Sequence, residues 1–290
     1  MVNPFEESFF RGIKSGDKLG EHALLTRALQ EISKALENDK INPVDFQDIY
    51  SRDKIAADLA YVEEMRRAFE KNATPESKES KRLATIFEGI FHTGARDYGW
   101  LGENARVIKT SDFDDMHCGV DGIVEFEEPG KNTGHLAVGI DVTYSTQLAE
   151  KFRKIKDDIK NGKPPVIKYF RSGNFRGELS KIPRVIVGAE RSNLIRLCSD
   201  LFIEPDKKRL TRHPFQMLQL KQVLLELSAF AEYARNLGKD DIAEVYRRDA
   251  EIIRRILQKK IITQGVRMGE WENDRVFQAI RKELENLKQT

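Results

Sequence analysis

The chain of 290 residues has little cysteine, no long apolar run and no large excess of one charge. Its two cysteines, Cys118 and Cys198, are too few for a disulfide framework and suit free thiols in a reducing compartment. No stretch approaches the roughly 18 consecutive apolar residues of a membrane span. The opening sequence, MVNPFEESFFRG, lacks a basic segment followed by an apolar one, so we expect no signal peptide. These absences predict a cytoplasmic protein that does not contact membranes.

Charged residues make up 33% of the chain, but the formal net charge is only +2. This balance argues against a protein that coats nucleic acid, although a local basic face can exist beside an acidic site. The sequence also contains no P-loop, GxGxxG, GxSxG or HExxH motif, and its five histidines show no ligand-like spacing. Nucleotide-binding loops, serine-hydrolase elbows and zinc-protease sites are therefore excluded.

The most informative stretch is a predicted β-hairpin between residues 118 and 144. Two runs rich in Val and Ile flank a turn-like patch from Glu127 to Gly134. If the loop is centred on Lys131, Asp121 falls directly opposite Asp141. One face is then almost wholly apolar and should pack on the core. On the first strand, this face consists of Cys118, Val120, Gly122, Val124 and Phe126.

Asp121 and Asp141 would place two like charges opposite each other in strands that are otherwise apolar. Directly opposite side chains have Cβ atoms roughly 5 Å apart, and like charges there destabilise a sheet. A bound divalent cation removes the conflict, because Mg²⁺ prefers hard oxygen ligands. The alternative is a bulge that shifts the register and leaves one aspartate in solvent at a strand end. We predict a metal site at Asp121 and Asp141 and keep the bulge as the competing interpretation.

Helical periodicity dominates on both sides of this hairpin. The first 75 residues and the chain from Thr211 onward carry apolar residues at helical spacing. Between them we expect a helix from Lys81, three strands, a helix ending near Lys160, two short strands and a further helix. This order predicts an α/β fold flanked by N- and C-terminal helical extensions.

An acid in one strand, an acid at the end of the next strand and a helix with a glutamate before them resemble the PD-(D/E)XK, or restriction-endonuclease-like, superfamily of nucleases. Val120-Asp121 corresponds to the first half of the motif and Asp141-Val142-Thr143 to the second. The resemblance covers about residues 81–201. It implies an αβββαβ core with a mixed central sheet over residues 79–205, between helical regions at 1–78 and 206–290.

The resemblance also implies roles for these residues. Asp121 and Asp141 would bind Mg²⁺ or Mn²⁺, with the backbone carbonyl of Val142 as a third ligand and Glu88 approaching from the helix. For Glu88, an exposed helix acid is the alternative interpretation. Asp114 and Asp115 precede the hairpin and would either add a ligand or form a solvated turn.

One departure from the family pattern concerns the lysine that usually follows the second acid by two residues. This chain has Thr143 there, so either the lysine function has moved or the site is inactive. Lys151 borders the buried face of the next predicted helix, and its long side chain can reach the acids. Gln147, about one turn earlier, can contact a metal-bound water. The alternatives are an ordinary exposed Lys151 and a Thr143 that offers only a hydroxyl hydrogen bond.

Basic residues for a phosphate backbone are scattered after that helix. Lys168, Arg171 and Arg176 lie in or beside RSGNFRG, which we interpret as a flexible basic loop that follows nucleic acid. A merely solvated loop is the alternative.

Together these observations predict a metal-dependent nuclease that hydrolyses phosphodiester bonds, with DNA as the expected substrate. The alternative is a catalytically inactive relative that serves as a nucleic-acid-binding or assembly module. In either case the helical extensions offer surfaces for a homo-oligomer or a protein partner.

Overall fold

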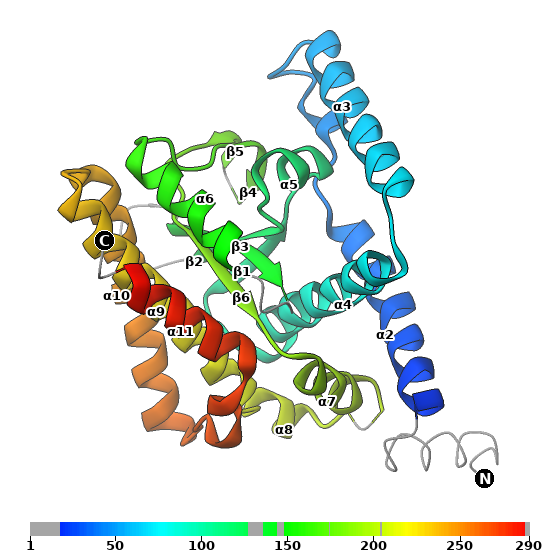
Figure 1. Cartoon of the computed structure of the whole chain (residues 1–290), viewed down its shortest axis with the longest axis vertical. Coiled ribbons are helices and arrows are strands. Elements are labelled where there is room, and N and C mark those ends of the chain that lie inside the picture. Colours follow the sequence, from blue (N-terminus) through cyan, green and yellow to red (C-terminus); the bar gives the residue numbers. More distant parts are fainter. Residues whose placement is uncertain (1–17, 127–135, 144–147, 174, 204, 288–290) are drawn as a thin grey trace.

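The computed structural model describes residues 18–126, 136–143, 148–173, 175–203 and 205–287. The chain runs from helices on one side, through short strands, to a second set of helices (Figure 1). The elements up to the hairpin are α2 (Lys18–Asp39), the 3-10 helix η1 (Pro43–Phe46), α3 (Arg52–Lys71), α4 (Pro75–Tyr98), β1 (Ala105–Lys109), α5 (Asp112–Cys118), β2 (Gly122–Phe126) and β3 (Leu136–Thr143). The elements after it are α6 (Ala149–Lys160), β4 (Ile167–Ser172), β5 (Phe175–Leu179), β6 (Arg184–Gly188), α7 (Arg191–Phe202), α8 (Lys207–Thr211), α9 (Phe215–Asn236), α10 (Asp240–Gln264), η2 (Gly269–Asn273) and α11 (Arg275–Leu287).

Helix α4 brings the predicted apolar arc into the centre of the molecule. It begins after Thr74, which forms a capping box with Ser77, and Pro75 occupies the first turn, where no backbone donor is needed. It ends at Gly99, whose φ of +62° is a left-handed conformation that glycine adopts without strain. Its buried face includes Leu83, Ile86, Phe87, Ile90 and Phe91, which recur at helical spacing.

Four strands form a sheet in the order β1-β2-β3-β6, with β3 and β6 parallel and the other neighbours antiparallel. In the β2–β3 hairpin, Gly122 pairs with Ile140 and Val124 with Val138. These pairs belong to the register centred on Lys131, so the predicted register is confirmed. No bulge displaces the five pairs from Gly122 to Phe126.

The predicted core-facing side of β2 is confirmed for Val124 and Phe126, and the other face of the strand is buried as well. All five of its residues are buried. Val124 and Phe126 join the main core, while Ile123 belongs to a second apolar cluster with Ile167 and Phe170. Cys118, expected on the strand, is instead the last residue of α5. The opposite face is buried because β4 and neighbouring segments pack against it, a long-range contact that strand alternation does not reveal.

Helix α9 covers the edge of the sheet at β6. Glu226 accepts a hydrogen bond from the Ile186 backbone N–H at 2.8 Å. Gln222 accepts from Gly188 N at 3.2 Å and donates to Gly188 O at 2.9 Å. These side chains replace a neighbouring strand, so buried backbone groups at the edge are satisfied.

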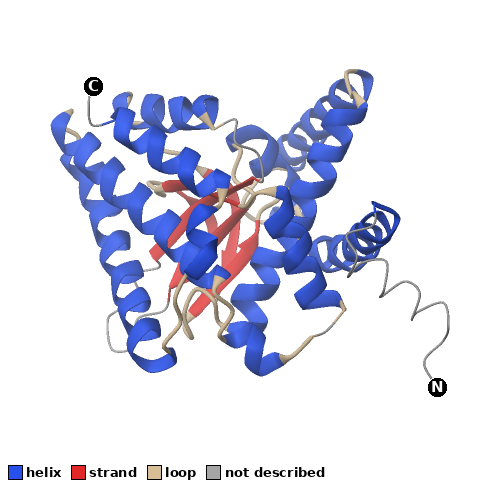
Figure 2. Cartoon of the chain, turned by 60° about the horizontal axis from the view of Figure 1, so that its bottom comes forward, coloured by secondary structure: helices blue, strands red, loops and turns tan. Residues whose placement is uncertain are grey.

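The predicted α/β class, organised around a central mixed sheet, is wrong. Helices make up most of the described chain, and the protein is helical with a minor sheet component (Figure 2). Helices α4, α9 and α10 have 24, 22 and 25 residues, whereas the strands have five to eight. The sequence pattern predicts which segments are helices and which are strands. It does not show how much of the hydrophobic core each type supplies, and this caused the error. One continuous apolar cluster draws most of its side chains from the helices between residues 24 and 287.

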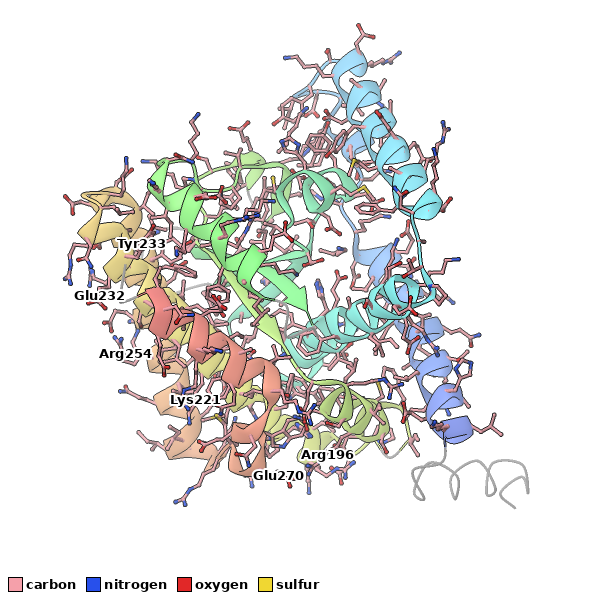
Figure 3. The ribbon with its side chains drawn as sticks, viewed as in Figure 1. Arg196, Lys221, Glu232, Tyr233, Arg254 and Glu270 are labelled. Carbon is pink, nitrogen blue, oxygen red and sulfur yellow. The ribbon has the colours of Figure 1, made fainter. Side chains whose placement is uncertain are left out.

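The outer faces of the C-terminal helices are charged. Arg196 of α7 pairs with Glu270 of η2, and Lys221 of α9 pairs with Glu272 at 3.0 Å (Figure 3). Exposed pairs of this kind add little stability. Within the ranges that the structure describes, no helix has the length and apolarity needed to cross a membrane.

Candidate active site

The predicted acid Glu88 lies in a buried ionic cluster where α4 meets the sheet. Its side chain is buried on the inner face of α4, so the interpretation of Glu88 as an exposed helix acid is wrong. Glu88 Oε1 is 2.8 Å from the Nζ of Lys109, the last residue of β1. Burial raises the pKa of Glu88, and the adjacent ammonium partly offsets that rise. The pair therefore supplies each partner with a counter-charge that water cannot provide at this depth.

Lys109 connects Glu88 to the segment that precedes β2. Its Nζ is 3.2 Å from Asp115 Oδ2 and donates to the backbone carbonyl of Asp121 at 3.1 Å. Burial disfavours the charged lysine, but the carboxylates of Asp115, Glu88 and Asp121 outweigh burial and raise the pKa of Lys109. Lys109 is therefore a permanent cation, unsuited to acting as a general base near neutral pH.

His92, one turn after Glu88 on α4, packs against the start of β2. A Cβ added at Gly122 would lie 3.1 Å from His92 Nε2 and 3.4 Å from the Ile108 carbonyl oxygen. A larger residue after Asp121 would therefore displace the ring or the strand. Burial, with the nearby charges of Lys109 and Arg96, lowers the pKa of His92 to about 3. His92 is a neutral imidazole at physiological pH.

Asp121 immediately precedes β2, and Asp141 lies in β3. The β2–β3 ladder ends at the pair of Gly122 and Ile140, and extending its register by one residue would set Asp121 opposite Asp141. Thr110 fixes the backbone here, donating from Oγ1 to the carbonyls of Val120 and Asp121 at 2.7 and 3.0 Å. The side chains of residues 136–143, including those of Asp141, Val142 and Thr143, lie outside what the structure describes.

The two acids before the hairpin do not form a solvated turn. They lie in α5, which Ser111 caps by accepting from Asp114 N at 3.1 Å. Asp114 is fully buried and accepts hydrogen bonds from the backbone N–H groups of Lys168 and Tyr169 at 2.7 and 3.1 Å. Asp114 therefore anchors β4, and Asp115 alone joins the Lys109 cluster.

Helix α6 lies as predicted, with Phe152, Ile155 and Ile159 buried, and Lys151 is half-buried on it. Lys154, three residues later on this helix, contacts the residue that ends α5. Its Nζ donates to the Cys118 carbonyl at 2.8 Å. Gln147, also a candidate, lies outside the described residues.

The three residues predicted to contact nucleic acid all bind the N-terminal helical region instead. Lys168 pairs with Asp58 at 2.5 Å and lies over the rings of Tyr50, Phe113 and Tyr169, each about 5 Å away. Arg171 pairs with Asp45 at 3.4 Å, and Arg176 bonds to Asp48. The expected flexible loop is wrong, because Arg171 and Arg176 face each other in the β4–β5 ladder. Carboxylates thus already compensate these three charges.

The donor set near Asp121 fits a hard divalent cation in its chemistry. The carboxylates of Glu88, Asp115 and Asp121 all act on the Lys109 ammonium. Among the residues with described side chains, no three His, Cys, Asp or Glu groups assemble as a metal site. Asp141, whose backbone lies in β3, is the further acid that the sequence predicts for this site. Oxygen-only donors of this kind suit Mg²⁺ or Mn²⁺.

Sequence reasoning missed Lys109 and His92. One signal was available for Lys109: it shares strand parity with Ala105 and Val107, which pack on the main core, so a lysine at that position has to be paired. No comparable signal marked His92, because its neighbour Gly122 lies 30 positions away in the chain.

Comparisons with protein-family models, curated proteins and solved structures found no match, so the function has to be argued from the residues themselves.

Proposed function

We propose that this chain is a metal-dependent nuclease of the PD-(D/E)XK type that hydrolyses phosphodiester bonds, with DNA as its substrate. The observation that carries the proposal is the β2–β3 register. Continued by one residue, this register supports facing positions for Asp121 and Asp141, and the buried Glu88 of the preceding helix shares the neighbour Lys109 with Asp121. Two facing carboxylates repel each other and lower the stability of the fold. A divalent cation bound between them removes this repulsion and gives the pair a function.

In this proposal Asp121, Asp141 and the Val142 carbonyl hold Mg²⁺ or Mn²⁺, and Glu88 approaches from α4. A bound metal would supply Lewis acidity and a more nucleophilic water. Lys109 holds Glu88 and Asp115 in place and neutralises part of their charge, so the acids can lie close together before metal binds. Neutral His92 fills the space above Gly122 without adding a competing positive charge.

The lysine absent at position 143 has two candidate replacements on α6. Lys154 contacts the carbonyl of Cys118, three residues before Asp121, and Lys151 precedes it on the same helix. An ammonium from α6 can contact a phosphate oxygen as a compact positive charge. Lys109 is less suited to this contact because only 7% of its surface is exposed.

We also infer that the protein acts in the cytoplasm. Its two cysteines are both free and buried, which fits a reducing compartment. Burial raises the pKa of Cys118 to about 11 and that of Cys198 to about 12, so neither is a reactive thiolate near neutral pH.

The test is cleavage of labelled single- and double-stranded DNA and RNA in Mg²⁺, Mn²⁺ or EDTA. We expect metal-dependent cutting that Asp121→Ala and Asp141→Ala each reduce by 100-fold or more (on the order of 3 kcal/mol in the barrier). Glu232→Ala is the matched control, because it removes an exposed acid on α9 and should leave cutting unchanged.

Mn²⁺ binding to the same proteins separates the enzyme from an inactive module. A folded wild-type protein that neither binds Mn²⁺ nor cuts any substrate would exclude the nuclease and favour the binding or assembly role. Cutting that survives Asp141→Ala would show that the activity arises elsewhere.

A further inference from the structure

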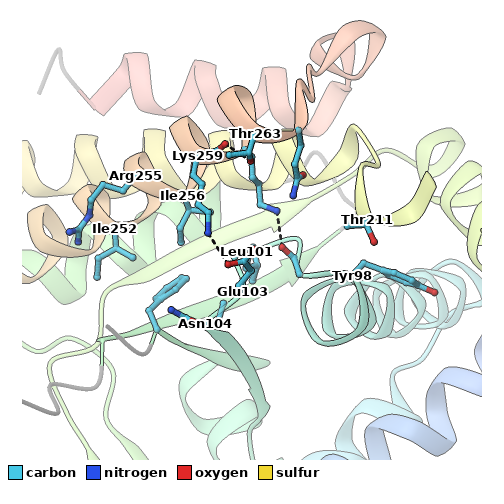
Figure 4. A pocket seen from close by; sticks show the side chains of 16 residues that line it. Tyr98, Leu101, Glu103, Asn104, Thr211, Ile252, Arg255, Ile256, Lys259 and Thr263 are labelled. Carbon is cyan, nitrogen blue, oxygen red and sulfur yellow. Dashed lines mark hydrogen bonds and ion pairs between the residues drawn. The ribbon is translucent and has the colours of Figure 1, made fainter. Parts of the chain in front are cut away.

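A cavity of about 350 Å³ lies far from the acid cluster, between α10 and the segment that joins α4 to β1 (Figure 4). Its size is at the lower end of small-molecule pockets, which run from roughly 300 to 1,000 Å³. The apolar part of its lining comes from Leu101, Ala105, Phe126, Ile252 and Ile256. Such a surface suits a flat or compact apolar group.

The charged part of the lining is strongly biased toward cations. Arg255, Lys259 and Lys260 of α10 line the cavity, whereas Glu103 is the sole acid among the described lining residues. Lys259 pairs with that acid at 2.8 Å. The cavity wall therefore has a surplus of positive charge.

Lys260 is the unusual member of this set. Only 5% of its surface is exposed, and its Nζ donates to the Gly99 carbonyl at 2.8 Å and to Gln216 Oε1 at 2.6 Å. Both acceptors are neutral, and the carboxylate that acts on Lys260 from further away, that of Glu103, is already paired with Lys259. The C-terminus of α4 offers only a partial negative charge through Gly99. A buried ammonium without an anion is costly, and burial lowers the pKa of Lys260 to about 8.

A second polar group at the cavity has an atom without a hydrogen-bond partner. Gln264 lines the cavity, and its Oε1 is buried without a hydrogen bond. Next to its apolar lining, the cavity therefore has the Lys260 ammonium, whose two acceptors are neutral, and the Gln264 amide oxygen, which has no hydrogen-bond donor in the described part of the chain.

We propose that this cavity binds a small organic anion with an apolar ring, whose anionic group supplies the missing counter-charge beside Lys260. The shared chemistry is a carboxylate or a phosphate ester joined to a flat apolar body that carries an N–H donor. This site is independent of the proposed nuclease activity, because none of its lining residues belongs to the acid cluster.

The test uses 8-anilinonaphthalene-1-sulfonate as an anionic probe and N-phenyl-1-naphthylamine as its neutral counterpart, in fluorescence titrations. We expect 1:1 binding of the anion, weakened about tenfold or more by Lys260→Met, because the variant loses a hydrogen bond from a charged donor; a tenfold loss corresponds to about 1.4 kcal/mol. The neutral probe should bind both proteins equally. Lys282→Met on α11 is the charge control and should bind the anion like wild type.

Two further measurements keep the proposal testable if Lys260→Met does not fold. Ile256→Trp keeps the charge but fills the cavity, so it should abolish binding of the probe. Phenyl phosphate and benzoate, added to wild type, should displace the probe, and the stronger competitor identifies the preferred anion. Unchanged binding by folded Lys260→Met, unchanged binding by Ile256→Trp, or displacement by neither anion would overturn the proposal.

Discussion

Two buried lysines contact the same helix, α4, in regions of opposite electrostatic character. Lys109 meets its middle at Glu88, where three carboxylates surround it, and its pKa is raised. Lys260 meets its end at the Gly99 carbonyl, where its hydrogen-bond partners are neutral, and its pKa falls to about 8. The two side chains are exposed to a similar small extent. The charge of the neighbours, more than the depth of burial, therefore decides whether a buried lysine stabilises the fold.

The largest effect should come from Lys109→Met. This change leaves Glu88 buried without its counter-charge, and breaking a buried pair in this way costs about 3–5 kcal/mol. Lys260→Met, the matched control, leaves only two neutral acceptors without a donor and should cost less, on the order of 1–3 kcal/mol. Urea denaturation of both variants at pH 7.5 gives the free energies of unfolding. Equal losses in the free energy of unfolding would mean that burial of the lysine, and not the charge of its neighbours, determines the loss.

A buried carboxyl without a hydrogen-bond partner sharpens the comparison. Asp249 on α10 is 1% exposed, both its oxygens lack hydrogen bonds, and burial raises its pKa from 3.8 to about 7. Because the folded pKa is the higher one, its contribution to stability is full below about pH 4 and is lost as pH rises through 7. Asp249→Asn should match wild type near pH 4 and be more stable at pH 8, by at most about 4 kcal/mol. Thermal unfolding at both pH values measures this, and an Asn variant less stable at pH 8 would contradict it.

The parts of the site that depend on local pattern could be predicted from the sequence. Strand alternation and turn residues defined the register that, continued by one residue, would set Asp121 opposite Asp141, and helical spacing placed Glu88 beside a buried arc. The cluster around Lys109 could not be predicted, because its contacts join α4, β1 and α5 through packing that no local period encodes. Pairing preferences of single residues do not specify which distant partner is chosen.

Long-range contacts also explain the errors elsewhere in the fold. Asp114 was expected in solvent because a run of acids normally is, yet it accepts from backbone groups more than 50 positions later. Strand β5 was missed because FRGEL lacks the β-branched residues that mark a strand, and it forms by pairing with β4. The class was misjudged because α9, rather than another strand, satisfies the β6 edge through Gln222 and Glu226.

A double-mutant cycle between Lys109 and Glu88 tests whether the pair is coupled. Glu88→Gln removes the buried negative charge, so it should recover part of the stability lost in Lys109→Met, with a coupling free energy of about 1–3 kcal/mol. Asp115 retains its charge in the double variant, which limits the recovery. Urea denaturation of the wild type and the three variants provides the cycle. Additive losses would mean that Lys109 acts through Asp115 or through the Asp121 carbonyl.

The smallest effect concerns the pH dependence of Lys260, and its sign is opposite to that of an acid such as Asp249. The folded pKa of about 8 lies below the ordinary value of 10.5. The contribution of this group to stability is therefore present above about pH 10.5 and lost as pH falls through 8. Lys260→Met should be most destabilised relative to wild type at pH 10.5, and the difference should shrink at pH 9 and again at pH 7.5. The exposed Lys282→Met should show no such trend. A difference in stability between the two proteins that grows toward pH 7.5 would mean that an anion of the protein itself already pairs with Lys260. The argument for an anionic ligand in the cavity would then fail.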